Sequence, residues 1–226
     1  MRLGLLGGSF NPIHRCHLSI AHSVRQHLQL DRVLFIPTGD PPHKPSGSLA
    51  SAAHRYRMVE LAIQGVAGFS LTDIEIRRPG KSYSVDTVRA VRQEYGPDAT
   101  LCFIIGLDAF LDLPSWKDPE ILLSECHFVV LSRPSVSFRT LRSLPLFHHI
   151  GEDTLTALDD GGTEQAHVLV PPEQSLTLLR LPPCYISASE IRRLVAGGRP
   201  LANRLPPLVV SYILREGLYR EDSERL

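Results

Sequence analysis

The hydrophobic positions of the chain follow two alternating patterns. Compact apolar runs are typical of strands, whereas apolar residues three and four positions apart are typical of helices that bury one face. Strands are predicted at residues 3–6, 32–37, 69–72, 101–105, 128–132 and 175–181. Helical stripes between the first four runs are formed by Leu18, Ala21, Val24 and Leu28, by Val59, Ala62, Ile63 and Val66, and by Val85, Val88, Val91 and Tyr95.

This alternation predicts an α/β fold with a doubly wound parallel sheet, because strands joined through helices run parallel by right-handed crossovers. Residues 101–105 are apolar without a break, as expected of a central strand buried on both faces. Ligands of such sheets bind at the carboxyl ends of the strands. Residues that follow the predicted strands are therefore the first candidates for a site.

The chain is predicted to form a core over residues 1–185 and a small helical part over 186–226 packed on it. Periodicity fails over residues 135–174, which predicts a loop-rich insertion in the core. Residues 205–219 carry an apolar cluster that suits a helix docked on the body of the protein.

The first predicted strand ends in Gly7 and Gly8, and His14 and His17 follow. We interpret this stretch as a strand, a phosphate-cradling turn and a helix that begins near Ile13. Glycines leave backbone N–H groups open to an anion, and the helix points its positive end at the same place. Spaced three apart, the two imidazoles share one helix face and can contact a polyphosphate. A zinc site is less favoured, because no acidic residue stands nearby on that helix.

Composition limits the partners. The 24 Lys and Arg residues balance 24 Asp and Glu residues, and no basic run stands out, so neither charge nor pattern predicts nucleic-acid binding. No apolar stretch reaches membrane-spanning length, and the apolar start of the chain is too short for a signal peptide. The four cysteines form no C-x-x-C pair and are interpreted as thiols of a reducing compartment, which favours a cytoplasmic protein with small-molecule substrates.

Further polar candidates follow other predicted strands. His43 and Lys44 lie in a proline-rich loop that holds them toward a phosphate or simply exposes them to solvent. Asp108 can accept hydrogen bonds from a ribose or cap a helix. Arg133 can clamp a phosphate or pair with a surface carboxylate. Each of these has an ordinary structural explanation beside the functional one.

Two predicted helix starts and the single tryptophan complete the set. Ser84 is a natural N-cap, and Ser187 with Glu190 has the spacing of a capping box, although a capped helix start still leaves N–H groups for an anion. Trp116 lies in a polar, proline-bounded loop, where its ring can stack on a heteroaromatic ring instead of anchoring a core.

Taken together, these segments resemble a known family. Residues 7–17 (GGSFNPIHRCH), the Pro41–Lys44 segment, residues 82–87 (SYSVDT), Gly106 to Trp116 and residues 186–192 (ISASEIR) are similar, in order, to the motifs of bacterial nicotinate-nucleotide adenylyltransferases. The resemblance implies a Rossmann-like fold, and an enzyme of NAD biosynthesis that joins ATP to nicotinate mononucleotide and releases pyrophosphate. It also implies Mg²⁺ that arrives with ATP and has no dedicated protein ligand.

The resemblance implies roles for individual residues. ATP is assigned to Gly7, Gly8, Ser9, Phe10, His14, His17, Gly106, Asp108, Ser187 and Arg192. The mononucleotide is assigned to His43, Lys44, Tyr83, Ser84, Trp116, Lys117 and Arg133. Catalysis is assigned to His14, His17, Lys44 and Arg192, because charge neutralisation and positioning suffice when a substrate phosphate is the nucleophile.

One departure from the family pattern stands inside the first motif. Cys16 occupies the glycine position of H-x-G-H, so a side chain stands where the nucleotide passes the helix. A degenerate, non-catalytic nucleotide binder is therefore one alternative. Adenylation of nicotinamide mononucleotide or another small phosphate ester is the other, and the oligomeric state is left open.

Overall fold

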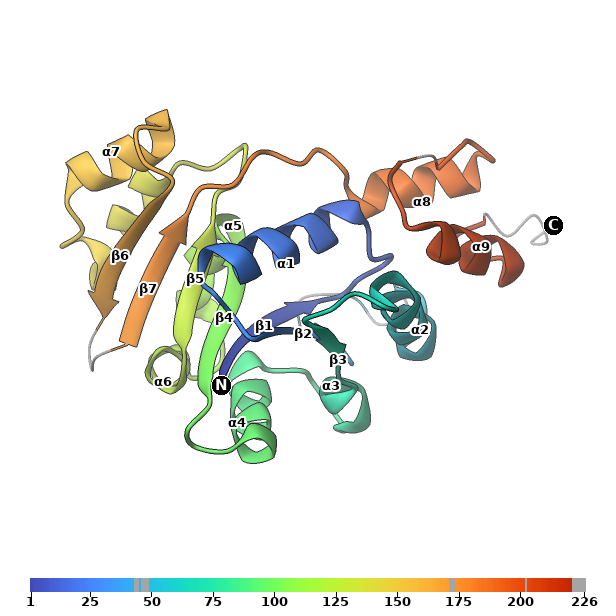
Figure 1. Ribbon diagram of the computed structural model, residues 1–226, viewed down its shortest axis with the longest axis horizontal. Coiled ribbons are helices and arrows are strands. Elements are labelled where there is room, and N and C mark those ends of the chain that lie inside the picture. Colours follow the sequence, from blue (N-terminus) through green and yellow to red (C-terminus); the bar gives the residue numbers. More distant parts are fainter. Residues whose placement is uncertain (43–44, 46–48, 171–173, 202, 221–226) are drawn as a thin grey trace.

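The computed structural model describes residues 1–42, 45, 49–170, 174–201 and 203–220. Seven strands form one sheet in the order β3-β2-β1-β4-β5-β7-β6, with every neighbouring pair parallel except β6 and β7 (Figure 1). The strands are β1 (Arg2–Gly8), β2 (Arg32–Pro37), β3 (Phe69–Leu71), β4 (Thr100–Gly106), β5 (His127–Leu131), β6 (Gln165–Val170) and β7 (Gln174–Leu179). The helices are α1 (Arg15–His27), α2 (Ala52–Ile63), α3 (Ile74–Arg77), α4 (Ser84–Tyr95), α5 (Leu107–Leu111), α6 (Pro119–Glu125), α7 (Glu152–Asp160), α8 (Ala188–Ala196) and α9 (Pro207–Arg215).

Helices cover both faces of the sheet, which confirms the doubly wound α/β prediction. One apolar cluster joins the sheet to α4, α5, α6 and α7, and a second joins its other face to α1, α2, α8 and α9. Strand β1 feeds both clusters, with Leu3 and Leu5 on one side and Leu6 on the other, as the alternation of side chains along a strand requires. Both faces of the central strands are therefore buried.

The chain changes direction at β1. It leaves β1 through α1 to β2 and β3 on one side, and returns through α4 to β4 on the other side (Figure 1). Crossovers that leave in opposite directions open a crevice at the carboxyl ends of the two neighbouring strands, here β1 and β4. Gly8 and Gly106 end these strands.

The prediction of a loop-rich segment over 135–174 is wrong in part. This segment forms α7, two short 3₁₀ helices over Phe138–Ser143 and Pro145–Phe147, and β6, an antiparallel edge strand. Phe138 and Phe147 are buried, with 1% exposed surface each. The apolar residues are too widely spaced along these short elements to form a periodic pattern, because each element contributes only one or two of them to the core.

The helical end of the chain is confirmed by α8 and α9. Val209, Tyr212 and Ile213 of α9 are buried in the second apolar cluster. The Tyr212 hydroxyl lies 2.8 Å from Nδ1 of His54 on α2, so the last helix contacts the body of the protein by a polar link as well. Within the residues that the structure describes, no helix is long and apolar enough to span a membrane.

Candidate active site

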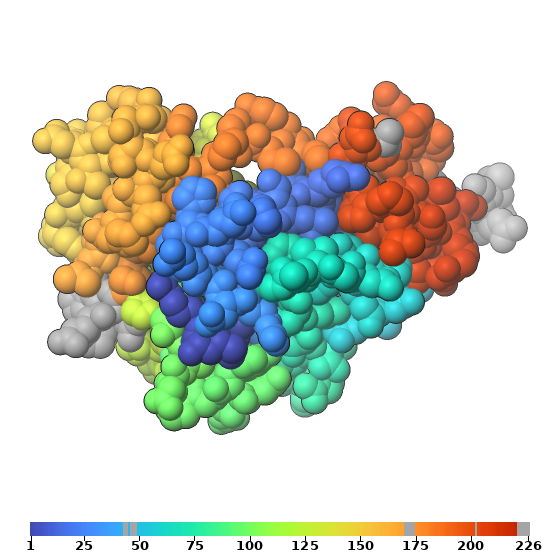
Figure 2. Space-filling model, in the orientation of Figure 1, coloured from blue at the N-terminus to red at the C-terminus, as the bar shows by residue number. Residues whose placement is uncertain are grey.

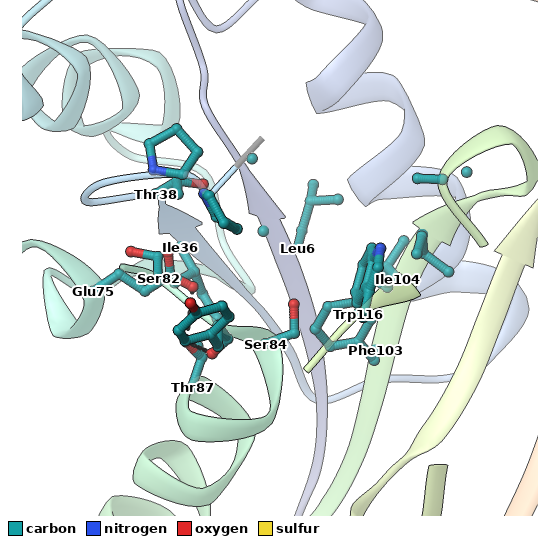
Figure 3. A pocket seen from close by; sticks show the side chains of 18 of the residues that line it. Leu6, Ile36, Thr38, Glu75, Ser82, Ser84, Thr87, Phe103, Ile104 and Trp116 are labelled. Carbon is teal, nitrogen blue, oxygen red and sulfur yellow. Dashed lines mark hydrogen bonds between the residues drawn. The ribbon is translucent and has the colours of Figure 1, made fainter. Parts of the chain in front are cut away.

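A cavity of about 350 Å³ opens at the carboxyl ends of β1, β2 and β4, where the crevice is expected (Figure 3). Trp116 and Phe103 form one side, and Glu75 and Ser82 lie on the opposite side, with Leu6 and Ser84 between them. Other lining residues include Gly7, Gly8, His17, Tyr83, Gly106, Lys117 and Arg133. Aromatic walls with a few polar groups suit a flat ligand with a charged end.

A second cavity, of about 850 Å³, lies beside the first. His17, Ile20, Leu131 and Arg133 line both cavities. The second is also lined by His14, Cys16, Cys184, Tyr185 and Ser187. The two cavities are thus adjacent, and His17 and Arg133 contribute to the walls of both.

His14 and His17 lie together at the start of α1. The helix begins at Arg15, two residues later than predicted, and His14 is its N-cap. The two imidazoles stack with their centroids 3.7 Å apart. The backbone N–H of His14 donates to Nδ1 of His17 over 3.2 Å. Because that nitrogen is an acceptor, the neutral ring of His17 carries its proton on Nε2 and can donate it to a ligand.

Both histidines are neutral in the absence of ligand. Burial, and then the charge of Arg133, lower the pKa of His14 to about 4. Burial, followed by the neighbouring His14 and Arg133, holds the pKa of His17 well below its ordinary value. A polyphosphate in the cavity would oppose the positive charge of Arg133 and raise the pKa of both rings, because an anion favours the protonated ring.

The glycine turn is open on one side. A Cβ atom at Gly7 would meet no atom within 4 Å, whereas a Cβ atom at Gly8 would lie 3.2 Å from the Phe10 ring. Phe10 is buried, and its ring contacts His17 edge-on at 5.1 Å between centroids. The ring of Phe10 therefore supports His17 from the core, and contacts of this residue with ATP would come from its backbone.

Asp108 and Arg133, predicted for different substrates, form an ion pair. Nε of Arg133 donates to Oδ1 of Asp108 over 3.0 Å. A Cβ atom at Gly106 would approach Nε of Arg133 to 2.4 Å and Oδ1 of Asp108 to 2.5 Å, so a larger residue there would displace this ion pair. Both side chains are partly exposed and remain within reach of a ligand.

The start of α4 forms the floor of the first cavity. The helix begins at Ser84 with Tyr83 as its N-cap, so the prediction of Ser84 as N-cap is wrong. The side chain of Ser84 points into the cavity (Figure 3). Nζ of Lys117 lies 3.0 Å from Oδ2 of Asp86 and 4.9 Å from the centroid of the Tyr83 ring. These contacts fix Lys117 and Tyr83 beside the first turn of the helix.

Glu75 is a lining residue that the sequence patterns missed. It is buried, its Oε1 accepts a hydrogen bond from Thr87 over 2.8 Å, and its Oε2 has no partner among the described residues. Burial raises the pKa of Glu75, and the hydrogen bond from Thr87 opposes that shift. Its position in a one-turn helix gives no periodic signal that marks it in the sequence.

Arg55 is the second residue that the patterns missed. Its side chain is 2% exposed and donates three hydrogen bonds. They run to the carbonyl oxygens of Ala50 at 2.9 Å, Ser9 at 3.0 Å and Gly39 at 3.1 Å. Arg55 therefore joins the glycine turn to the loop after β2. A helical arginine among apolar neighbours was the available signal.

The start of α8 approaches the glycine turn from the far end of the chain. Ser187 caps the helix by accepting from the Glu190 N–H at 3.2 Å, while the carboxylate of Glu190 pairs with Arg204. Nη1 of Arg192 donates to the Asn11 carbonyl over 2.8 Å. Asn11 Oδ1 in turn accepts from the Tyr219 hydroxyl at 2.8 Å. Arg192 thus lies beside the first motif but lines neither cavity.

The prediction of four thiols is wrong for two of the cysteines. Cys16 and Cys184 form a disulfide with their Cα atoms 5.7 Å apart, whereas Cys102 and Cys126 are buried thiols. A separation of 168 residues hides such a pair from any local pattern. The side chain of Cys16 is therefore turned toward residue 184 instead of standing free at the helix start.

Most of the predicted residues are brought to this one region. His43 and Lys44 lie outside the described residues, and their assignment stays a prediction. Within the described part of the chain, no group of three or more His, Cys, Asp and Glu side chains is arranged to hold a metal ion.

Known proteins are similar to this chain in sequence over nearly its whole length. The profile of the family described as cytidylyltransferase-like matches residues 5–194. A protein of Pelobacter propionicus described as "Probable nicotinate-nucleotide adenylyltransferase" is 42% identical over 226 residues, covering 98% of this chain and 99% of the relative. One of Syntrophotalea carbinolica with the same description is 44% identical over 225 residues, covering 97% and 98%.

Solved structures share the fold. The nicotinic acid mononucleotide adenylyltransferase of Plasmodium falciparum, complexed with NaAD, superimposes with a TM-score of 0.69 at 20% identity, over 96% of this chain and 97% of that one. This likeness confirms the Rossmann-like nucleotidyltransferase architecture. With the family profile and the full-length relatives, it leads to one conclusion: this chain belongs to the nicotinate-nucleotide adenylyltransferase family of cytidylyltransferase-like proteins.

Proposed function

We propose that this protein transfers the adenylyl group of ATP to nicotinate mononucleotide, giving deamido-NAD and pyrophosphate. A phosphate oxygen of the mononucleotide attacks the α-phosphorus of ATP, and the bond from that phosphorus to the bridging oxygen of pyrophosphate breaks. No protein nucleophile is needed, so the protein contributes position and charge. The observation that carries the proposal is the pair of adjacent cavities, both of which His17 and Arg133 line.

The first cavity suits the pyridine ring of the mononucleotide. Trp116 and Phe103 offer aromatic surface on one side, and the first N–H groups of α4 lie at Tyr83 and Ser84. The positive end of a 12-residue helix attracts a carboxylate. An uncharged carboxamide gains less from that field, so this helix start favours the acid over the amide.

The second cavity and the glycine turn suit the triphosphate. His14, His17 and Ser187 converge there with the N-terminal ends of α1 and α8. The Nε2–H of His17 is the fixed donor for charge that develops around the α-phosphate. Donors fixed in advance stabilise a transition state more than groups that must reorient. We place Arg133 between the two reacting phosphates, because it lines both cavities.

Magnesium enters the proposal as part of the substrate Mg-ATP. The described residues present no cluster of three ligands, and the Asp108 carboxylate is engaged by Arg133. Phosphate oxygens and water would thus supply most of the ligands of the ion, as Mg²⁺ commonly prefers with nucleotides.

Purified protein incubated with Mg-ATP and either nicotinate or nicotinamide mononucleotide tests the proposal. Pyrophosphate release and the dinucleotide product are measured. We expect turnover with a preference for the acid. Preference for the amide would keep the reaction and refute the substrate, and ATP binding without turnover on either compound would favour a degenerate binder or another phosphate ester.

The contribution of the helix start can be tested on the same assay. Ser84→Pro removes one N–H group at the first helical position, which tolerates proline in helices. We expect it to lower the preference for the acid and to leave ATP binding unchanged. Ser124→Ala, a change at an exposed serine of α6, is the matched control.

A further inference from the structure

The disulfide between Cys16 and Cys184 lies in the wall of the second cavity. Cys16 is the second residue of α1, beside His14 and His17, and is 4% exposed. Cys184 is exposed to solvent and lies three residues before Ser187, the N-cap of α8. The bond therefore connects the two helix starts that face the proposed triphosphate site.

Residues 181–187, which we call the strap, connect β7 to α8. Figure 2 shows this orange segment bridging the two ends of the molecule above α1. The strap begins where the Leu181 N–H donates to Ser132 Oγ at 3.0 Å, and it ends at the Ser187 cap. Among the described residues, no hydrogen bond is made by residues 182–186. The disulfide is thus the direct bond that holds the middle of the strap on α1.

We propose that Cys16 and Cys184 are a reversible redox pair, and that the disulfide form binds Mg-ATP more tightly than the dithiol form. The inference rests on the proposed function for the identity of the nucleotide. Its basis is the position of the pair: the bond fixes the start of α8 relative to His14 and His17. Groups held in place before binding lose less freedom when the ligand arrives.

The exchange chemistry follows from the unequal exposure of the two cysteines. A dithiol reductant attacks Sγ of Cys184, the exposed cysteine, and Cys16 leaves as a thiolate at the positive end of α1, where a negative charge is stabilised. The second thiol of the reductant then releases Cys184. Two electrons and two protons pass to the protein, and the reductant becomes a disulfide. Oxidation by glutathione disulfide is the reverse, with two molecules of glutathione released.

The size of the effect follows from how much of the strap the bond immobilises. Freeing one side chain near the ligand weakens binding by about 2- to 10-fold. We therefore expect the dissociation constant of Mg-ATP to rise by that factor on reduction, while the binding of the mononucleotide, which contacts the other cavity, stays unchanged.

The test is calorimetric titration of the full chain with Mg-ATP, without mononucleotide, after equilibration with glutathione disulfide or with dithiothreitol. Each sample is also denatured and alkylated, and the labelled cysteines are counted by mass spectrometry. We expect two labelled cysteines, Cys102 and Cys126, in the oxidised sample and four in the reduced one, together with weaker ATP binding after reduction.

Two variants separate the pair from other effects of the reductant. Cys184→Ser should bind Mg-ATP as weakly as the reduced protein in both buffers. Cys102→Ala, a change at a buried thiol outside the pair, should keep the redox response. Four labelled cysteines in the oxidising buffer, equal ATP affinity in the two states, or no ATP binding in either would overturn the proposal. Redox-dependent ATP binding without adenylyl transfer would support it while refuting the proposed function.

Discussion

The most demanding test of this architecture is the removal of the Arg55 guanidinium. Arg55→Met keeps an unbranched apolar stem and removes the donors to Ala50, Ser9 and Gly39. A buried carbonyl left without its donor costs about 1–3 kcal/mol, and these three belong to half-buried residues, so each loss lies near the low end of that range. Three such losses are offset in part, because the variant no longer buries a charged group. The net loss in the free energy of unfolding is expected to be about 2 kcal/mol.

Urea unfolding, followed by far-ultraviolet circular dichroism, measures this loss as a change in midpoint at constant slope. The matched control is Arg57→Met, which removes an exposed guanidinium from the same helix, where it pairs with Glu60. Its cost should stay below about 1 kcal/mol, as for other exposed ion pairs. Equal losses in Arg55→Met and Arg57→Met would refute the reasoning, because the buried hydrogen bonds would then contribute nothing beyond a surface charge.

Three further predictions concern the site. His17→Ala should lower turnover by about 10²- to 10³-fold while ATP affinity falls less than tenfold, and unchanged turnover in the folded variant would contradict the role of Nε2–H. The pKa of His14 is about 4 in the folded protein against an ordinary 6.5. Between pH 6.5 and pH 4 the unfolded chain binds a proton at His14 and the folded protein largely does not, so the free energy of unfolding should fall by about 3 kcal/mol over that range. Unfolding of His14→Gln across that range should show a shallower loss than wild type or His149→Gln, a change at an exposed site. Mononucleotide should quench the fluorescence of Trp116, the only tryptophan, and Trp116→Ala should raise the mononucleotide KM by about 10- to 100-fold without changing that of ATP.

The parallel sheet could be predicted because its information is local. Each central strand is a continuous apolar run, and each long helix carries its own stripe. Over residues 135–174 the same reasoning failed, since β6 is an edge strand that needs β7 as its partner and α7 contributes only Leu155 and Leu158 to the core as buried residues. Such elements are defined by what they pack against, which no local pattern reports.

The residues of the candidate site divide in the same way, into those that a local pattern marks and those that depend on distant partners. The residues in ordered motifs, such as His14, His17 and Trp116, could be named from the sequence, and their roles stay predictions. The supporting residues could not, because Arg55 acts through three carbonyls from separate segments and Glu75 through Thr87. The Cys16 disulfide was missed for a related reason: its partner lies 168 residues away.

The contacts of Asn11 set an order on the assembly of the site. Its carbonyl and side chain are held by Arg192 and Tyr219, which follow it by 181 and 208 residues. During synthesis the chain emerges from its amino end, so the first motif is made early and meets these partners only when the last helices have left the ribosome. A growing chain would thus carry its glycine turn with the contacts from Arg55 and Ala50 but without those from the last helices. We expect competence for nucleotide binding to arise at the end of translation, so that unfinished chains would not sequester ATP.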